Sequence, residues 1–363
     1  MDVVPADPKY WRVNPFAAEI QDGMLYGRGA IDIKGKGIVD LMTLIRLKRA
    51  KTPLKRDLIF LAVADEEVNS IGSRTMIAQH PELIRQAEYL IDEGETIRET
   101  PDGKPLHAMV GIGEKSPLWL TLTFKGQPGH GSIPIADSAV NRALNAAARI
   151  LAYSREIPFT LVPGLEESLR NQYGEDVTRL PGYSRDMRTS LQNPQFLKAL
   201  ATKPGLDALM RNTISITGMS GSDKINIIPN EATLRLDCRL IPGISKEAFL
   251  TDLRAAVADP TMQVQIDEYY DARYSPADTG FFTALKQVFT RRGMAIPVIP
   301  TIFTSSTDAS LYRALGIHVY GFESTPIDEQ VATTAHGNDE RIRVQSIETG
   351  LEVLHDLILE LNK

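Results

Sequence analysis

In the first third of the chain, apolar residues recur at helical spacing or form short continuous runs. Between Gly35 and Ala50 they lie three and four positions apart, which predicts an amphipathic helix. Residues 58–64 read LIFLAVA, a run typical of a strand that is buried on both faces. We expect a second, shorter strand at 88–91 and a helix at about 73–80 between the two. Strand, helix and strand in this order predict a parallel sheet.

The middle of the chain alternates apolar and polar residues instead. This alternation covers about 118–124, 234–240 and 262–266. A period of two is typical of strands with one solvated face, which are mostly antiparallel. Helical patterns accompany these strands at about 137–153 and 245–258. The pattern predicts an α+β unit, with a sheet on one side and two helices on the other.

Two further stretches complete the pattern. Proline and glycine residues interrupt 154–211, where we expect an insertion of short helices and loops. After Pro276 the α/β pattern returns. The expected elements there are a helix at 281–292, a strand at 298–303, a helix at 309–315, a strand at 317–322 and a final amphipathic helix at about 347–361.

The simplest architecture has one domain interrupted by another. Residues 1–115 and 275–363 would share one mainly parallel sheet in a discontinuous α/β domain. Residues 116–274 would form an inserted α+β domain.

Composition narrows the class of protein. Among 363 residues, 46 acidic and 40 basic residues give a net charge of −6, which argues against a nucleic-acid-binding protein with its basic face. The longest strongly apolar run, 58–64, is far shorter than the roughly 20 residues of a membrane span. The single cysteine, Cys238, excludes a disulfide-stapled scaffold, and its place on the apolar phase of a strand predicts a core residue.

Acidic residues follow two of the expected strands. Asp65, Glu66 and Glu67 come directly after the first, and Asp92 and Glu93 after the second. Ligands of open α/β sheets lie beyond the carboxyl ends of the strands. Carboxylates gathered there repel one another, and a cation would relieve that repulsion. Carboxylates together with imidazole suit zinc, manganese or cobalt, whereas the competing interpretation is a set of solvated acidic turns.

Other site motifs do not fit. The segment 27–32 reads GRGAID, which begins like a dinucleotide fingerprint but has Asp32 where the last glycine should be. Gly35-Lys36 lacks the upstream glycine of a phosphate-binding loop. The sequence contains neither a His-Glu-x-x-His motif nor a Gly-x-Ser-x-Gly nucleophile elbow.

Six segments, in order, resemble the two-zinc exopeptidase family of aminoacylase, glutamate carboxypeptidase, carboxypeptidase S and succinyl-diaminopimelate desuccinylase. The resemblance covers nearly the whole chain, and is strongest to the carboxypeptidase S and N-acyl-amino-acid hydrolase branch. The segments are LYGRGAIDIKG at 25–35, ADEE at 64–67 followed by Gly72-Ser73, GHGS at 129–132, NIIP at 226–229, DCR at 237–239 and TAHGNDE at 334–340.

The resemblance implies a catalytic centre with two divalent metal ions, zinc in the first place and cobalt or manganese as alternatives. Asp32 would bridge the two ions, Glu67 and His336 would complete one site, and Asp92 would bind the other. Glu66 would be the general base, taking a proton from the metal-bridging water. The implied reaction is hydrolysis of an amide bond next to a free carboxylate, in a short peptide or an N-acyl amino acid.

The resemblance also assigns residues around this centre. Asp2 would orient a metal-bound histidine. His130, from an inserted ferredoxin-like lid domain, would reach the scissile carbonyl oxygen, often across the interface of a homodimer formed through that domain. Asn226 and Arg239 would hold the free carboxylate of the substrate, for which a planar guanidinium is suited.

One departure from the family pattern concerns the start of the chain. The family reads His-x-Asp-Val-Val-Pro, and its metal-binding histidine would precede residue 1, so we expect an N-terminally truncated chain. One metal site would then keep only Asp32 and Asp92 from the protein, and its affinity should be much weaker. The alternative to an active hydrolase is therefore a metal-poor, non-catalytic relative that only binds ligand or dimerises.

Overall fold

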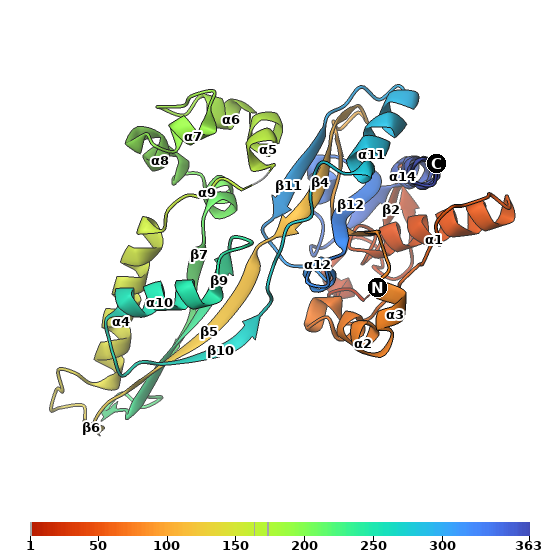
Figure 1. Ribbon diagram of the computed structural model, residues 1–363. Helices are drawn as coiled ribbons and strands as arrows, with labels where there is room; N and C mark the ends of the chain where they lie inside the picture. Colours follow the sequence, from red (N-terminus) through yellow and green to blue (C-terminus); the bar gives the residue numbers. More distant parts are fainter. Residues whose placement is uncertain (1, 163, 173) are drawn as a thin grey trace.

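Two four-stranded sheets organise the molecule, and Figure 1 shows one extending away from the other. The computed structural model describes residues 2–162, 164–172 and 174–363. Strand β5 (Ser116–Lys125) follows β4 (Pro105–Glu114) after a single residue, so the chain passes directly from one sheet into the other.

The first sheet is mixed and has the order β11-β4-β12-β3. Strand β11 (Val298–Phe303) is parallel to β4, and β12 (His318–Ile327) is parallel to β3 (Tyr89–Glu99), while shorter contacts of β4 with β3 and β12 are antiparallel. The sheet therefore combines strands from both ends of the sequence, as the return of the α/β pattern after Pro276 predicted.

Helices α11 (Gly280–Arg291) and α14 (Val344–Leu361) pack against this sheet, and α1 (Lys34–Arg49) packs against α14. The core between them is aromatic. The rings of Phe281 and Tyr320 stack with their centroids 4.4 Å apart, and both side chains are fully buried. These helices lie close to the expected bounds.

The second sheet is antiparallel, with the order β10-β5-β9-β7. Its other strands are β7 (Thr213–Ser220), β9 (Glu231–Leu240) and β10 (Gln263–Tyr269). Helices α4 (Ala139–Glu156) and α10 (Lys246–Val257) cover its apolar face, where Cys238 is buried as predicted. The other face is mostly polar, with Trp119 as an exception, because the side chains alternate along each strand.

A cluster of short helices lies beside the junction of the two sheets (Figure 1). Its apolar side chains form a small core of their own. The buried Lys115, between β4 and β5, donates hydrogen bonds to the carbonyl oxygens of Ala208 and Arg211 and so ties the cluster to the junction. The helices are α5 (Leu165–Gln172), α6 (Gly174–Thr178), α7 (Met187–Ser190), α8 (Pro194–Leu200) and α9 (Pro204–Met210).

Several small elements complete the fold. Strands β1 (Ile20–Gln21), β2 (Met24–Tyr26) and β13 (Arg341–Arg343) form a three-stranded sheet, and β6 (Gly129–His130) pairs with β8 (Ile227–Ile228). The remaining helices are η1 (Pro8–Tyr10), η2 (Glu66–Val68), α2 (Ile71–Gln79), α3 (Pro81–Ile84), α12 (Ala309–Arg313) and α13 (Glu329–Ala332). None of the helices in the described ranges has the length and apolar character needed to cross a membrane.

The strand expected at 58–64 is wrong. These residues are extended coil, and Ile59 is 57% exposed. A strand needs a neighbour that pairs with its backbone groups, and within the described parts of the chain no strand pairs with this segment. The apolar run identified the composition of a buried strand, but not the presence of a partner.

The aromatic core gives a direct stability prediction. Phe281→Ala removes a fully buried ring and should lower the free energy of unfolding by about 3–5 kcal/mol. Phe16→Ala is the matched control, because Phe16 is 67% exposed and its loss should change stability by less than about 0.5 kcal/mol. Urea unfolding followed by circular dichroism measures both, and equal losses would contradict the placement of the core.

Candidate metal centre and active site

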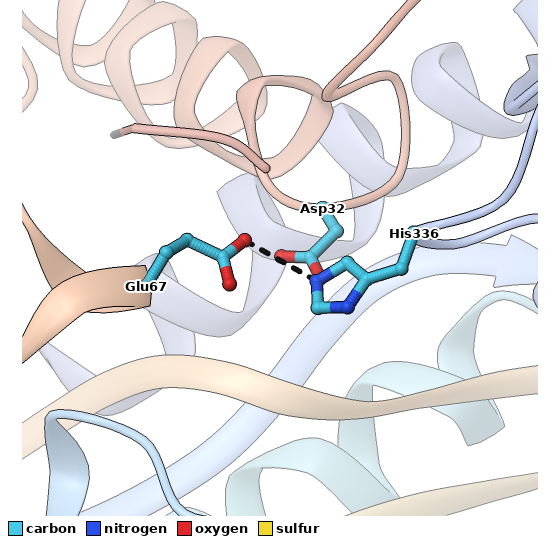
Figure 2. Close-up of side chains that lie close together, drawn as sticks. All are labelled: Asp32, Glu67 and His336. Carbon is cyan, nitrogen blue, oxygen red and sulfur yellow. Dashed lines mark hydrogen bonds and ion pairs between the residues drawn. The ribbon is translucent and has the colours of Figure 1, made fainter. Parts of the chain in front are cut away.

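Asp32, Glu67 and His336 converge from three distant segments (Figure 2). His336 Nε2 lies 2.8 Å from Asp32 Oδ2 and 3.2 Å from Glu67 Oε1. One ligand atom of each residue lies within 4.8 Å of those of the other two. Asp32 precedes α1, Glu67 is on η2 and His336 follows α13, so only the folded chain creates this group.

A buried ion pair fixes the segments that carry Asp32 and His336. Glu340 is fully buried, and its carboxylate accepts hydrogen bonds from the backbone N–H groups of Gly29, Ile31 and Asp32 at 2.8–3.0 Å. Arg28 donates to Glu340 at 2.7 Å and to the carbonyl oxygen of Gly337 at 2.9 Å. The pair therefore connects the loop before α1 with the loop that presents His336.

The turn that carries Glu66 and Glu67 is held by unusual backbone conformations. Asp65, Asn69 and Ser70 all have positive φ angles, which few side chains adopt without a compensating contact. The carboxylate of Asp2 accepts hydrogen bonds from the N–H groups of Glu66 and Glu67 at 3.0 and 3.2 Å. Asp2 thus contacts the backbone of the turn directly.

Gly72 closes this turn against the preceding segment. A Cβ atom at Gly72 would lie 2.5 Å from the carbonyl oxygen of Ala64, which is too close for any other residue without a shift of the backbone. The glycine after the acidic pair therefore has a packing role.

The expected end of the second strand at Asp92 is wrong. Strand β3 runs on to Glu99, but its register with β12 shifts between Gly321 and Phe322, which oppose Asp92 and Glu95. Glu93 and Gly94 are therefore extra residues in the strand. Such bulges redirect side chains and are frequent beside active sites.

Burial and mutual repulsion disfavour the charged forms of these carboxyl groups. Burial raises the pKa of Glu66 to about 8, and the charges of Asp308 and Glu67 add to the shift. Burial raises the pKa of Asp92 to about 6, again with Asp308 contributing. The pKa of Glu93 is also well above its usual range, because of burial and the charges of Glu66 and Asp92.

These residues fit divalent metal ions. An imidazole with two carboxylates is a donor set typical of zinc. Burial raises the pKa of Asp32 and that of Glu67, so each carboxylate would gain from a positive charge beside it. In addition, Asp92 Oδ2 is buried and has no hydrogen-bond partner among the described residues. A buried oxygen of this kind is costly unless it is paired or coordinates a metal.

Two acidic residues near this centre were missed by the sequence analysis. Asp308 is 4% exposed and accepts a hydrogen bond from Ser73 Oγ at 2.5 Å, and Tyr312 donates to the same hydroxyl at 2.8 Å. Burial raises the pKa of Glu323 to about 8. Asp308 follows β11 by five residues, so the rule that singled out acids after strands could have found it.

The structure does not bring the remaining candidates to this cluster within one chain. His130 on β6 and Asn226 before β8 lie together, because the Gly131 N–H donates to the Asn226 carbonyl oxygen at 2.8 Å. Figure 1 shows β6 at the end of the antiparallel sheet that is remote from α1. Arg239 lies on β9 and forms an ion pair with Asp237 at 2.8 Å.

A fold of this kind with an Asp–Glu–His cluster defines a class of metal-dependent hydrolases. The model of peptidase family M20/M25/M40 matches residues 1–360, and the chain belongs to this family. The family resemblance inferred from the sequence motifs is therefore confirmed. The chain is accordingly a hydrolase of the metallopeptidase type, and divalent metals, typically zinc, are the cofactors of the family.

Named relatives show which branches are similar. Mouse N-fatty-acyl-amino acid synthase/hydrolase PM20D1 is 26% identical over 373 residues, which cover 99% of this chain and 72% of the relative. Probable carboxypeptidase S-like 2 of Dictyostelium discoideum is 27% identical over 374 residues, which cover 100% of this chain and 70% of the relative. Rat aminoacylase-1A is 25% identical, covering 99% of this chain and 78% of that protein.

Solved structures share the fold. An M20 family metallo-carboxypeptidase from Sulfolobus solfataricus superposes with a TM-score of 0.66 at 19% identity, covering 98% of this chain and 82% of its own. Human carnosine dipeptidase 1 superposes with a TM-score of 0.61 at 17% identity, and the match covers 99% of this chain and 79% of the dipeptidase chain.

The raised pKa of Glu66 predicts how pH affects the metal-free protein. The unfolded-state pKa is near 4.3 and the folded value is about 8. The folded state therefore holds this proton more tightly. That stabilisation is complete below the unfolded pKa and is lost as pH rises toward 8.

Thermal unfolding of chelator-treated protein should therefore show a midpoint that falls by at least about 3 °C between pH 5 and pH 8. Glu66→Gln should reduce the slope, because glutamine does not titrate. Glu82→Gln, at an exposed position on α3, is the control and should keep the slope. A midpoint independent of pH in the unsubstituted protein would contradict the buried acidic cluster.

Proposed function

We propose that this chain hydrolyses an amide bond next to a free carboxylate, in N-acyl amino acids or short peptides. The observation that carries the proposal is the position of Glu66. Its neighbour Glu67 joins Asp32 and His336 in the cluster, while Glu66 stays outside that group. Adjacent residues thus divide two tasks, of which one is to hold a metal ion and the other to move a proton.

Asp32, Glu67 and His336 would hold one divalent ion, and Asp32 with Asp92 would hold a second. Such ions polarise a scissile carbonyl and make water a stronger nucleophile at neutral pH. Glu66 takes a proton from the attacking water and delivers it to the leaving nitrogen. A pKa raised toward neutrality suits a group that must both accept and release a proton.

Asp2 has a supporting part in this scheme. Its carboxylate holds the N–H groups of Glu66 and Glu67, so it fixes the direction in which the two side chains leave the turn. The positive φ angles on both sides of the turn make this support necessary. We therefore place Asp2 among the positioning residues of the site.

The inserted residues 116–274 would act as a lid and dimerisation domain on a catalytic domain of 1–115 and 275–363. Asn226 and Arg239 would hold the substrate carboxylate, and Asn226, which lies beside the segment of His130, would act in the same site as that histidine. Strand β6, which carries His130, lies far from α1 and α2 in Figure 1. We infer that His130 serves the site of a second subunit, where it would donate a hydrogen bond to the scissile carbonyl oxygen.

The similar proteins support this range of substrates. Their names describe an N-fatty-acyl-amino acid synthase/hydrolase, a carboxypeptidase S-like protein and an aminoacylase. All three names are consistent with chemistry at an amide bond beside an amino-acid carboxylate.

Two neighbouring substitutions test the division of tasks. Glu66→Gln should lower kcat by about 10²–10⁴-fold, because the proton acceptor is lost, and should leave the bound zinc nearly unchanged. Glu67→Gln should lower both kcat and the zinc content, because a ligand of the cluster is lost. Hydrolysis of N-acyl amino acids and zinc analysis by mass spectrometry provide the two readouts.

Comparable zinc loss in the two variants would show that the roles are misassigned. Glu82→Gln, at an exposed glutamate on α3, is the control and should keep both activity and zinc.

A further inference from the structure

A cavity of about 170 Å³ opens beside Glu66 and Glu67. The antiparallel sheet lines one part of it, through β5 and the end of β10, and the turn at 66–70 and the segment 306–311 line the rest. The apolar part of the lining consists of Pro117, Trp119, Tyr270 and Leu311. The proposed general base therefore borders a cavity in which the rings of Trp119 and Tyr270 lie among mostly polar lining residues.

A second cavity of about 360 Å³ adjoins the first, and the two share Tyr270, Ser310 and Leu311 as lining residues. Neither Glu66 nor Glu67 lines it. Its apolar lining adds Ile77, Tyr269 and Ala314 to the shared residues. The pair forms one path that leads from the general base toward the region of α2 and α12.

An irregularity in the antiparallel sheet lies beside these cavities. The pairing of β10 with β5 shifts register between Ile266 and Glu268, so Glu268 opposes Trp119. The two faces of β5 differ in burial. Leu118 and Leu120 pack under α4 and α10, while Trp119 projects from the opposite face and remains 42% exposed.

Glu67 and Glu268, two of the carboxylates along the path, already have partners within the chain. Glu67 contacts His336 in the cluster. Glu268 lies 3.9 Å from the guanidinium of Arg74, whose charge also lies over the ring of Tyr270 at 4.7 Å. The one cation of the lining is thus occupied, and the carboxylates of Glu66, Glu67 and Glu268 would repel a substrate carboxylate.

We propose that these joined cavities bind the acyl part of the substrate, as an uncharged apolar group larger than acetyl. This inference rests on the proposed function, since it takes Glu66 to mark the scissile bond. The free carboxylate of the substrate then lies on the other side of that bond. Trp119, Tyr270 and Leu311 are the residues that determine acyl specificity.

Tryptophan fluorescence tests the site without catalysis. The chain contains two tryptophans, Trp11 and Trp119, and Trp11 is buried outside both cavities. The probes are N-(decylsulfonyl)glycine and N-(methylsulfonyl)glycine, sulfonamides that are not hydrolysed, added to the metal-loaded full chain. The long ligand should shift the emission to the blue and bind at least about tenfold more tightly than the short one.

Variants assign the signal to one residue. Trp11→Phe should keep the shift and Trp119→Phe should remove it. Trp119→Ala should weaken binding of the long ligand, measured by calorimetry, by about tenfold, with little effect on the short one. Ile266→Ala is the matched control, because Ile266 is exposed on the adjacent strand and lines neither cavity.

Equal affinity for the two ligands, or a shift that persists in Trp119→Phe, would overturn the proposal. Tighter binding of decylamine than of the long sulfonamide, with the same Trp119 signal, would overturn it as well, because the path would then select a cation. Hydrolysis of N-acetyl amino acids without preference for long acyl groups contradicts the acyl site alone. Selective binding of the long ligand without hydrolysis contradicts the proposed function alone.

Discussion

The buried pair of Arg28 and Glu340 is the interaction on which the candidate centre depends. The Glu340 carboxylate accepts hydrogen bonds from three backbone N–H groups of the loop that ends in Asp32. Arg28 binds Glu340 and donates a hydrogen bond to the carbonyl oxygen of Gly337, in the loop that carries His336. Removing one partner of a buried pair typically costs about 3–5 kcal/mol, because the other charge is left unpaired. The geometry of Asp32 and His336 is therefore coupled to the stability of the fold.

Around this anchor the chain concentrates negative charge that its own cations do not neutralise. Glu66, Asp92 and Glu93 all have raised pKa values, with burial as the main cause. Such an arrangement costs stability in the metal-free protein, and a divalent cation would recover that cost. The bulge in β3, the strained turn around Glu66 and the buried Asp92 oxygen are consistent with a site built for a cation.

Local pattern was enough to predict the long helices and three strands of the antiparallel sheet, since periodicity reports directly which face is buried, but it did not predict β7. It failed at 58–64, because pairing depends on a neighbouring strand that composition does not reveal. The site residues Asp32, Glu67 and His336 could be named from the motifs, but their contact could not be derived from spacing alone. Asp308 was missed although it follows a strand, and its hydrogen bond with Ser73, 235 positions away in the chain, could not be derived from local pattern.

The most direct measurement is a crystal structure of the zinc-loaded protein with anomalous data collected at the zinc edge. We expect a peak within about 2.0–2.2 Å of an oxygen of Asp32, an oxygen of Glu67 and a ring nitrogen of His336. Glu66 should stay outside that coordination sphere. Zinc bound elsewhere, or Glu66 as a ligand in place of Glu67, would contradict this expectation.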